Sequence, residues 1–361
     1  MSRVVFIVDN LSLPRCIKRI TAFIEHGVNV KVYGYDRGRS HCNQFPFDVH
    51  VVILRQLTDG KDYFSKLKSI KDDVRRVVIE NSDDDSIFYS FGFIASLMLA
   101  KMGTKFVYEI SDVRYASYKK FAPFIAIFKY IDKWIIKKSF ATVMTSGGFK
   151  EFFNSNKKEI FVIPNKVSNY WSFYSRESIK PNNNRIRFAF VGLLRYISIF
   201  KFAKVIGEKF PNHSFDFYGA PSKEISQKMM NGLKSYENVR FNGPFKNPED
   251  LGKIYKDIDV VVSCYDIKTL NERIAEPNKL YESMFFCRPI LVSQNIFLSK
   301  QVEKFGCGYS VDALSEESIY QFVKTLSIKD LISISEKDLN VPPQELLDNT
   351  KVIIEFINTQ E

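Results

Sequence analysis

The stretch EPNKLYESMFFCRPILVS at residues 276–293 contains, in succession, the two elements of an α/β protein. Pro277 suits the first position of a helix, where the N–H that proline lacks would be unpaired anyway. The apolar run that begins at Ile290 is typical of a strand buried in a parallel sheet. We therefore predict a helix from Pro277 that leads directly into a buried strand.

The same alternation extends outward along the whole chain. Strand-like runs separated by helical patterns lie at 4–8, 28–33, 51–54, 86–90, 105–110 and 141–145, and again at 186–191, 214–218, 239–241, 260–264, 290–293 and 308–310. Such an alternation is typical of βαβ units in parallel sheets. Between the two series, SNYWSFYSRESIKPNNNR at 168–185 is polar and lacks a period, which indicates a linker. The final apolar period, at 344–358, predicts an amphipathic helix.

Length and charge limit the class of protein. A chain of 361 residues has the length of about two domains. Its 45% hydrophobic content excludes disordered, collagen-like and low-complexity proteins. The formal net charge of +11 and the 15% aromatic content indicate an anionic partner: nucleic acid, a lipid surface or a phosphorylated small molecule. Composition leaves all three open.

Several kinds of site are missing from the sequence. The five cysteines have no CxxC spacing, and the four histidines form no HExxH or zinc-finger spacing. GxSxG, Walker A and GxGxxG motifs are also absent, which argues against serine-hydrolase, P-loop and nicotinamide chemistry. We interpret the acidic run at 83–85 as a charged turn, and we expect no metal and no other cofactor.

The sequence shows no targeting or membrane-spanning segment. The apolar run at 4–8 is interrupted by Asp9 and is too short for the core of a signal peptide. The longest apolar stretches, at 121–128 and 96–100, fall far short of the roughly 18 residues that a spanning helix needs. We therefore expect a cytoplasmic protein.

A first candidate site follows the strand that opens the second half, in FAFVGLLR at 188–195. Gly192 permits a sharp turn at the carboxyl end of this strand, the edge where open α/β sheets bind ligands. Arg195 and Lys201 lie in the following loop and early helix, from where both could offset the charge of a diphosphate. The alternative is that they are two basic residues on a solvated helix.

A second candidate site is the helix predicted from Pro277. Its amino end offers unpaired amides and positive potential to a phosphate. Glu282 could accept two hydrogen bonds from a ribose diol, and Lys279 could face the phosphates or the sugar. The alternative is that Glu282 and Lys279 are an exposed helical pair.

Taken together, the second half resembles the donor domain of retaining GT-B glycosyltransferases, specifically glycosyltransferase family 4 of the surface-polysaccharide type. The resemblance covers nearly all of residues 186–310 and follows the family's order. It is carried by FVGLLRY with Lys201, FDFYG ending at Gly219, VRFNGPF from Val239, EDLGKIYKDIDVVVSCY from Glu249 and EPNKLYESMFFCRPILVS from Glu276.

This resemblance implies a GT-B fold, in which two Rossmann-like α/β domains face each other across a cleft. We expect the acceptor-side domain at 1–170, a linker at 171–185 and the nucleotide-sugar donor domain at 186–341. The C-terminal helix, within 342–361, is expected to pack back on the N-terminal domain.

On the donor side, Arg195 and Lys201 match the family's basic pair on the donor diphosphate. Glu282 matches the second glutamate of the E-x7-E motif, which holds the donor ribose. The first glutamate of that motif would fall at Ile274, where this chain departs from the pattern, and Glu276 or Glu272 is left to reach the sugar. Phe245 belongs to the stretch 243–245, which matches the loop beside the nucleotide base. Further donor contacts are expected at Gly192, Gly219, Asn278 and Lys279.

The first half resembles the family more loosely. VYEISDVR at 107–114 matches a strand that often ends in an acidic or histidine residue near the acceptor hydroxyl. Asp112 is the candidate for this catalytic position, with Glu109 as second choice. The alternative is that Asp112 caps the following helix. Arg114, as a contact for an acceptor phosphate, and Asn10, in the loop after the first strand, complete the expected acceptor side.

Residues 115–140 are unusually rich in aromatic and lysine residues. On a helix, one face would carry Phe121, Phe124, Ile125, Phe128, Ile131 and Ile135, and the other Lys129, Asp132, Lys133 and Lys137. Such a helix can pack on a sheet or lie on an anionic membrane. We favour the membrane, since Tyr115, Tyr118, Tyr130 and Trp134 exceed one apolar stripe.

The expected protein is thus a retaining, metal-independent glycosyltransferase that uses a UDP- or GDP-sugar. Its acceptor would be a glycan or a lipid-diphosphate-linked sugar in bacterial capsule, O-antigen or exopolysaccharide synthesis, at the inner face of the plasma membrane. One alternative is a GT-B nucleotide-sugar 2-epimerase. Another is a basic nucleic-acid-binding protein, although we expect no nucleic acid partner.

Overall fold

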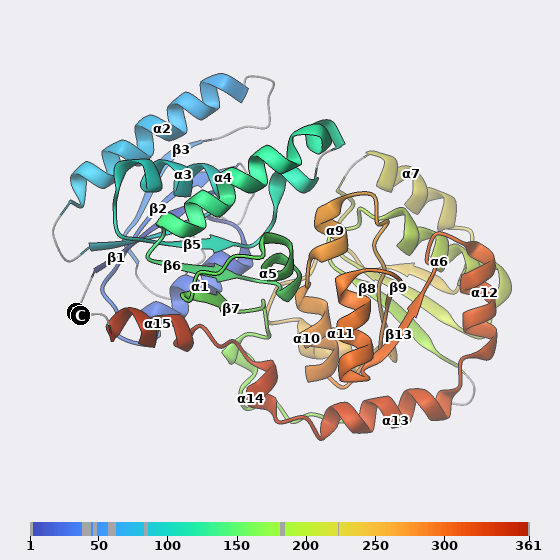
Figure 1. Cartoon of the computed structure of the whole chain (residues 1–361). Helices are drawn as coiled ribbons and strands as arrows, with labels where there is room; N and C mark the ends of the chain where they lie inside the picture. Colours follow the sequence, from blue (N-terminus) through green and yellow to red (C-terminus); the bar gives the residue numbers. More distant parts are fainter. Residues whose placement is uncertain are drawn as a thin grey trace. The chain divides into compact units, whose positions relative to one another are not determined.

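A computed structural model describes residues 3–37, 45, 49–56, 63–82, 86–117, 119–180, 185–222 and 224–359. The acidic run 83–85 and Tyr118 lie outside the described residues. The chain divides into two compact units (Figure 1). The first comprises Met1–Pro164 and Asn349–Glu361, and the second comprises Asn165–Asp348.

The described part of the first unit contains a seven-stranded parallel sheet with strand order β3-β2-β1-β4-β5-β6-β7. Its strands are β1 (Arg3–Val8), β2 (Val30–Asp36), β3 (Val51–Gln56), β4 (Ser86–Phe91), β5 (Phe106–Ile110), β6 (Ala141–Met144) and β7 (Ile160–Val162). Its helices are α1 (Pro14–Glu25), α2 (Tyr63–Glu80), α3 (Phe93–Met102), the 3-10 helices η1 (Arg114–Ser117) and η2 (Lys119–Phe124), α4 (Ile125–Lys138), α5 (Gly147–Phe153) and α15 (Lys351–Asn358).

The described part of the second unit contains a six-stranded parallel sheet with strand order β10-β9-β8-β11-β12-β13. Its strands are β8 (Arg187–Val191), β9 (Ser214–Tyr218), β10 (Val239–Phe241), β11 (Val260–Ser263), β12 (Ile290–Ser293) and β13 (Gly308–Val311). Its helices are η3 (Asn169–Trp171), α6 (Ile197–Lys209), α7 (Glu224–Leu233), α8 (Leu251–Lys256), α9 (Leu270–Ile274), α10 (Asn278–Phe285), α11 (Phe297–Phe305), α12 (Glu316–Thr325), α13 (Ile328–Leu339) and α14 (Pro343–Leu346).

Both sheets reverse the direction of winding once. In the first, successive strands lead outward from β1 to one edge and from β4 to the other. In the second, the reversal lies between β8 and β11. Ligands of open α/β sheets bind at this switch point, beyond the carboxyl ends of the strands. The loops after β1, β4, β8 and β11 are therefore the places to look for sites.

The boundary between the units lies earlier in the chain than the expected linker at 171–185. Residues 165–180 belong to the second unit because aromatic and arginine side chains hold them there. Trp171 packs edge-on against Phe286, with 5.4 Å between ring centroids. Arg176 donates hydrogen bonds to the carbonyl oxygens of Phe285, at 2.8 Å, and Met284, at 3.0 Å, which end α10.

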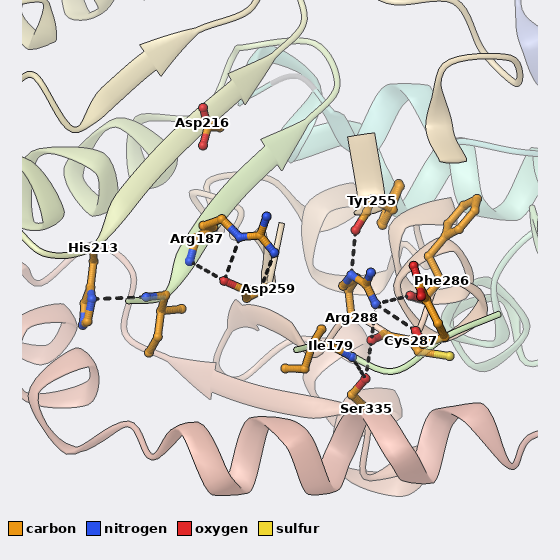
Figure 2. A network of polar contacts seen from close by, with 12 residues as sticks. Ile179, Arg187, His213, Asp216, Tyr255, Asp259, Phe286, Cys287, Arg288 and Ser335 are labelled. Carbon is orange, nitrogen blue, oxygen red and sulfur yellow. Dashed lines mark hydrogen bonds and ion pairs between the residues drawn. The ribbon is translucent and has the colours of Figure 1, made fainter. Parts of the chain in front are cut away.

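A second arginine, Arg288, holds the same region of the second unit together. Arg288 is 4% exposed and donates to the carbonyl oxygens of Tyr255, Phe286 and Cys287 (Figure 2). It also donates to the carbonyl oxygen of Glu177. Carbonyl groups at helix ends lack partners within the helix, and a cation there also suits the helix dipole. Arg176 and Arg288 thereby hold α10, the helix of the stretch 276–293, in a fixed position within the second unit.

The helix expected at 344–358 is interrupted. Leu347 pairs with Val167 in an isolated parallel bridge, and the Asp348 N–H donates to the Val167 carbonyl oxygen at 2.8 Å. This pairing replaces helical hydrogen bonds and separates α14, in the second unit, from α15, in the first. In α15, Ile353, Ile354 and Ile357 are buried in the core of the first sheet.

Candidate functional site

Three glycines lie together where β8, β9 and β10 end. The Gly192 N–H donates to the Tyr218 carbonyl oxygen at 2.8 Å, and the Gly219 N–H donates to the Gly243 carbonyl oxygen at 2.7 Å. A Cβ on Gly219 would lie 1.9 Å from the Gly192 carbonyl oxygen, so only glycine fits there. The backbones of these loops are thus packed more closely than side chains would allow.

The α10 helix brings its polar side chains to these turns. A Cβ on Gly192 would lie 3.9 Å from Cε of Lys279. The Lys279 ammonium pairs with Glu282 Oε2 at 2.5 Å. Glu282 also accepts hydrogen bonds from the Tyr255 hydroxyl, at 2.7 Å, and from Asn278 Nδ2. Pro277 is the N-cap and Asn278 the first helical residue, so the helix begins one position later than predicted.

Glu282 is only 3% exposed, so the alternative of an exposed helical pair is wrong for it. Burial, together with the adjacent Glu282 carboxylate, raises the pKa of Tyr255 well above its usual value. Tyr255 therefore stays a neutral donor at physiological pH. It was not among the residues predicted from sequence, because its contact with Glu282 joins α8 to α10 across 27 positions.

The two basic residues after β8 point to different neighbours. The guanidinium of Arg195, an exposed residue, lies 4.8 Å from the ring centroid of Tyr196. Lys201 lies in α6, and its ammonium donates to the Leu314 carbonyl oxygen at 2.7 Å. Arg195 is thus in the turn itself, whereas Lys201 is held by the loop after β13.

A carboxylate already covers the amino end of α6. Asp266, which follows β11, accepts the Ser198 N–H at 2.9 Å and pairs with the Lys268 ammonium at 2.8 Å. Burial alone would raise the pKa of Asp266, but Lys268 and the backbone amides of Ser198 and Ile197 outweigh it and lower that pKa. A phosphate would have to displace Asp266 to use this helix end. Sequence analysis missed Asp266, although an acidic residue just after a strand at the switch point is a recognisable signal.

The other expected donor residues belong to the same unit. Glu276 is buried and accepts a hydrogen bond from the Tyr281 hydroxyl. Glu272, the other glutamate considered for the sugar, closes a capping box on α9: its carboxylate accepts the Thr269 N–H at 3.1 Å. Phe245 is partly buried against the α10 side of the sheet. The Glu272 carboxylate is therefore held by backbone amides at the start of α9.

In the first unit, two ion pairs lie at the switch point. Arg114 pairs with Asp9 at 3.1 Å, and Arg15 pairs with Asp112 at 3.0 Å. Gly92, at the start of α3, leaves room for Asp9, since a Cβ there would lie 2.6 Å from Asp9 Oδ2. These groups line a crevice of about 10 Å³, which holds about one water molecule. The Asp112 side chain is 42% exposed.

Asn10 and Glu109 have contacts within the first unit. Asn10 Oδ1 accepts the Ser12 N–H at 3.0 Å, which forms a tight turn after β1. Glu109 is 1% exposed and accepts hydrogen bonds from Arg19, at 3.0 Å, and from the Tyr89 hydroxyl. Arg19 in turn donates to Thr350, just before α15. Glu109 therefore belongs to a buried network rather than to the crevice, and we do not retain it as an acceptor residue.

The helix α4 differs from the expected two-faced pattern. Asp132, placed on the polar face, is 2% exposed and accepts hydrogen bonds from the Tyr108 hydroxyl at 2.6 Å and the Tyr115 hydroxyl at 2.7 Å. That prediction was wrong because two tyrosines provide partners for a buried carboxylate. Conversely, Phe124, Ile127 and Tyr130 are 51%, 58% and 75% exposed. They form an exposed apolar stripe, which we call the α4 stripe.

Two kinds of feature were searched for over the described ranges. No group of three or more histidine, cysteine, aspartate or glutamate side chains there is placed to hold a metal ion. No described helix has the length and apolar character needed to cross a membrane.

Comparisons with known proteins give matches to solved structures. Neither a family model nor a curated protein matches. HepE (Alr3699) from Anabaena, in complex with UDP and glucose, has a TM-score of 0.71 at 12% identity, over 100% of this chain and 99% of that chain. A glycosyltransferase from Rickettsia africae ESF-5 has a TM-score of 0.69 at 11% identity, over 99% and 98%. A putative UDP-N-acetylglucosamine 2-epimerase from Listeria monocytogenes has a TM-score of 0.66 at 14% identity, over 94% and 91%.

The likeness covers both parallel sheets and nearly all of the chain. The predicted fold class is therefore confirmed: the chain has the GT-B fold, with two Rossmann-like α/β domains.

Proposed function

We propose that this chain is a glycosyltransferase that takes its sugar from a nucleotide-sugar bound by the second unit. The observation that carries the proposal is the cluster at the switch point between β8 and β11. There the Lys279–Glu282 pair of α10 lies beside the glycine turn at Gly192. Solved structures of similar fold that contain UDP or UDP-glucose support a nucleotide-sugar as the donor.

In this proposal Glu282 binds the donor ribose and cations bind the diphosphate. Three donors already hold the Glu282 carboxylate, so a ribose diol must replace at least one of them. Lys279 is the best suited to leave, because its ammonium then becomes available to the diphosphate. Arg195, in the adjacent turn, is the second cation. Lys201 would join them by leaving the Leu314 carbonyl oxygen.

The remaining expected donor residues complete the pocket. Gly192 and Gly219 let the backbone approach the diphosphate, Phe245 lies beside the base, and Glu276 with Asn278 faces the sugar. The bond between the anomeric carbon and the diphosphate oxygen breaks, and its electron pair stays on that oxygen, where the cations stabilise it. The acceptor hydroxyl oxygen forms the new bond on the same face, with retention.

We place the acceptor in the first unit, at the crevice of Asp9, Arg15, Asp112 and Arg114. Asp112, with its exposed side chain, is the candidate to receive the proton of the acceptor hydroxyl, and Arg114 to contact an acceptor phosphate. The acceptor class is a glycan or a lipid-diphosphate-linked sugar of bacterial surface polysaccharide. No cofactor takes part in this proposal.

The α4 stripe supports a location at the inner face of the membrane. Ile127 and Tyr130 are exposed on α4, and Phe124 is exposed at the end of η2, directly before it. The helix α4 also exposes Lys133 and Lys137. An apolar stripe beside lysines suits the boundary of an anionic lipid layer. Flotation with phosphatidylglycerol vesicles should recover the wild type and less of an I127D/Y130D variant. Equal recovery of the two would remove this part of the proposal.

The donor is tested by heating the protein with UDP, GDP and their sugars, because a ligand that binds only the native state raises the melting temperature. We expect UDP or GDP to raise it, and Arg195→Ala to reduce the rise. Lys234→Gln, an exposed charge change elsewhere in the second unit, should leave it unaltered. If no nucleotide raises the melting temperature, the proposed function is refuted.

A 2-epimerase is the second candidate, because the Listeria protein has a similar fold. Such an enzyme needs acidic or histidine side chains at the sugar. Among the described residues, His26, His50 and His213 all precede strands. They therefore lie at the amino ends of the strands, whereas the candidate sites lie beyond the carboxyl ends. Incubation of the nucleotide-sugar without an acceptor separates the two functions. An epimerised sugar would support the epimerase, and transfer that requires an acceptor would support the transferase.

A further inference from the structure

The second unit has a polar cavity apart from the cluster of Gly192, Lys279 and Glu282. It has a volume of about 570 Å³, within the range of small-molecule sites. Its walls come from β8, β9 and β10, from the residues after α8 and from Lys180 and Arg185. The lining residues are Lys180, Arg185, Arg187, Asp216, Tyr218, Arg240, Asn242 and Asp257.

Two guanidinium groups in this cavity are fixed from behind. Arg187 donates through Nε and Nη2 to Asp259, at 3.1 and 2.8 Å (Figure 2). Arg240 donates through the same atoms to Asp216, at 2.7 and 2.8 Å. Both carboxylates are buried. Two-point pairing of this kind sets the plane and direction of each guanidinium.

The two ion pairs leave one amino group of each guanidinium available as a hydrogen-bond donor. Within the described part of the chain, Nη1 of Arg187 and Nη1 of Arg240 have no hydrogen-bond partner, and neither has the Lys180 ammonium or the Tyr218 hydroxyl. Burial raises the pKa of Tyr218, so its hydroxyl keeps its proton at neutral pH. Four groups that can donate but are not engaged therefore line one cavity.

The charged residues that line the cavity are mostly basic. Lys180, Arg185, Arg187 and Arg240 outnumber the carboxylates of Asp216 and Asp257. Asp216 is itself covered by Arg240. An anion with several oxygen atoms could accept from two fixed guanidinium groups at once, which is the arrangement proteins use for phosphate.

We propose that this cavity is a second binding site, for a small solute that carries phosphate groups. It lies against the same strands as the glycine turns, since Tyr218 accepts the Gly192 N–H through its carbonyl oxygen. The site does not depend on the proposed transferase activity, because its residues are distinct from those of the donor cluster.

Calorimetric titration with inorganic pyrophosphate tests the proposal, on the wild type and on the donor-cluster variant Arg195→Ala. Pyrophosphate can bind at both places, so binding that persists in Arg195→Ala and is lost in cavity variants reports on the cavity. We expect such binding, weakened about 3- to 10-fold in Lys180→Gln by the loss of one charge-assisted contact. Lys180 is exposed and unpaired within the described residues, so this variant should fold.

A second variant removes the Arg240 guanidinium together with the charge of its partner Asp216, so that no unpaired buried carboxylate remains. The double substitution R240M/D216N deletes both members of this ion pair and should abolish the binding at the cavity. Lys234→Gln lowers the net charge equally, outside the cavity, and should bind as the wild type does. Unaltered binding in Lys180→Gln and R240M/D216N, or equal weakening in Lys234→Gln, would overturn the proposal. If UDP itself fails to bind, the proposed function fails, while the comparison of these variants still tests the cavity.

Discussion

The Glu282 carboxylate is the most informative group to perturb, because it is buried and its three partners are known. Glu282→Gln keeps the shape of the side chain and removes its charge. The new amide has one acceptor oxygen, so it can accept from Asn278 or from the Tyr255 hydroxyl, which bond different oxygens of Glu282, but not from both. With the oxygen toward Asn278, its N–H groups face the Lys279 ammonium, which now lies 2.5 Å from Oε2.

The expected cost follows from the burial of the pair. The side chains of Lys279 and Glu282 are 12% and 4% exposed, and breaking a buried pair costs about 3 to 5 kcal/mol. Since Lys279 is beside an open turn and can recover some water, we expect Glu282→Gln to lower the free energy of unfolding by about 2 to 4 kcal/mol. Adding Lys279→Met removes the stranded charge, so the double variant should recover about 1 to 3 kcal/mol.

Urea unfolding can follow the second unit alone. The sequence has two tryptophans: Trp134 lies in α4, and Trp171 packs on Phe286 at the end of α10. In a Trp134→Phe background, the emission of Trp171 therefore reports on the unit that contains Glu282. A loss below about 0.5 kcal/mol for Glu282→Gln, or strict additivity of the two substitutions, would refute the reasoning.

Three further predictions concern stability. Arg288→Met leaves four carbonyl oxygens without their donor and should lower the free energy of unfolding in urea by about 3 to 5 kcal/mol. The control Arg273→Met, on the surface, should lower it by less than about 0.5 kcal/mol, and equal losses would contradict the anchoring role of Arg288. Gly219→Ala, with φ of +139° and a Cβ 1.9 Å from backbone, should cost about 2 to 4 kcal/mol, and Gly232→Ala, in open space on α7, should gain about 0.5 to 1 kcal/mol. Burial raises the pKa of Asp132 from 3.8 to about 6, although the hydrogen bonds from Tyr108 and Tyr115 act to lower it. The folded state therefore holds the carboxyl proton of Asp132 more tightly than the unfolded chain does, so stability falls as pH rises from about 4 through 6. Over that range the stability of the wild type relative to Asp132→Asn should fall by about 3 kcal/mol in urea titrations, and a constant difference would show that Asp132 does not titrate there.

Local patterns in the sequence predicted most of the elements. The strands at 239–241 and 290–293 have the bounds that their apolar runs indicated. Gly192 could be singled out because a glycine directly after a buried strand indicates a turn at the sheet edge. These features depend on neighbours in the chain, and a sequence shows such neighbours directly.

Contacts between distant residues could not be read in this way. The pairing of Asp266 with the amino end of α6 spans 68 positions, and the burial of Asp132 depends on two tyrosines from other elements. The break after α14 results from the pairing of Leu347 with Val167. In each case a tertiary contact outweighs the local pattern, and one sequence by itself does not reveal which residues meet.

The helix α15 has a consequence for how the chain folds during synthesis. The second unit is one continuous segment, Asn165–Asp348, whereas the first includes Asn349–Glu361. On the ribosome, the first sheet emerges early, but Ile353, Ile354 and Ile357, which are part of its core, emerge only after the whole second unit. The first unit is therefore completed after the second has been made, and until then its apolar surface beside α1 is exposed to water or chaperones.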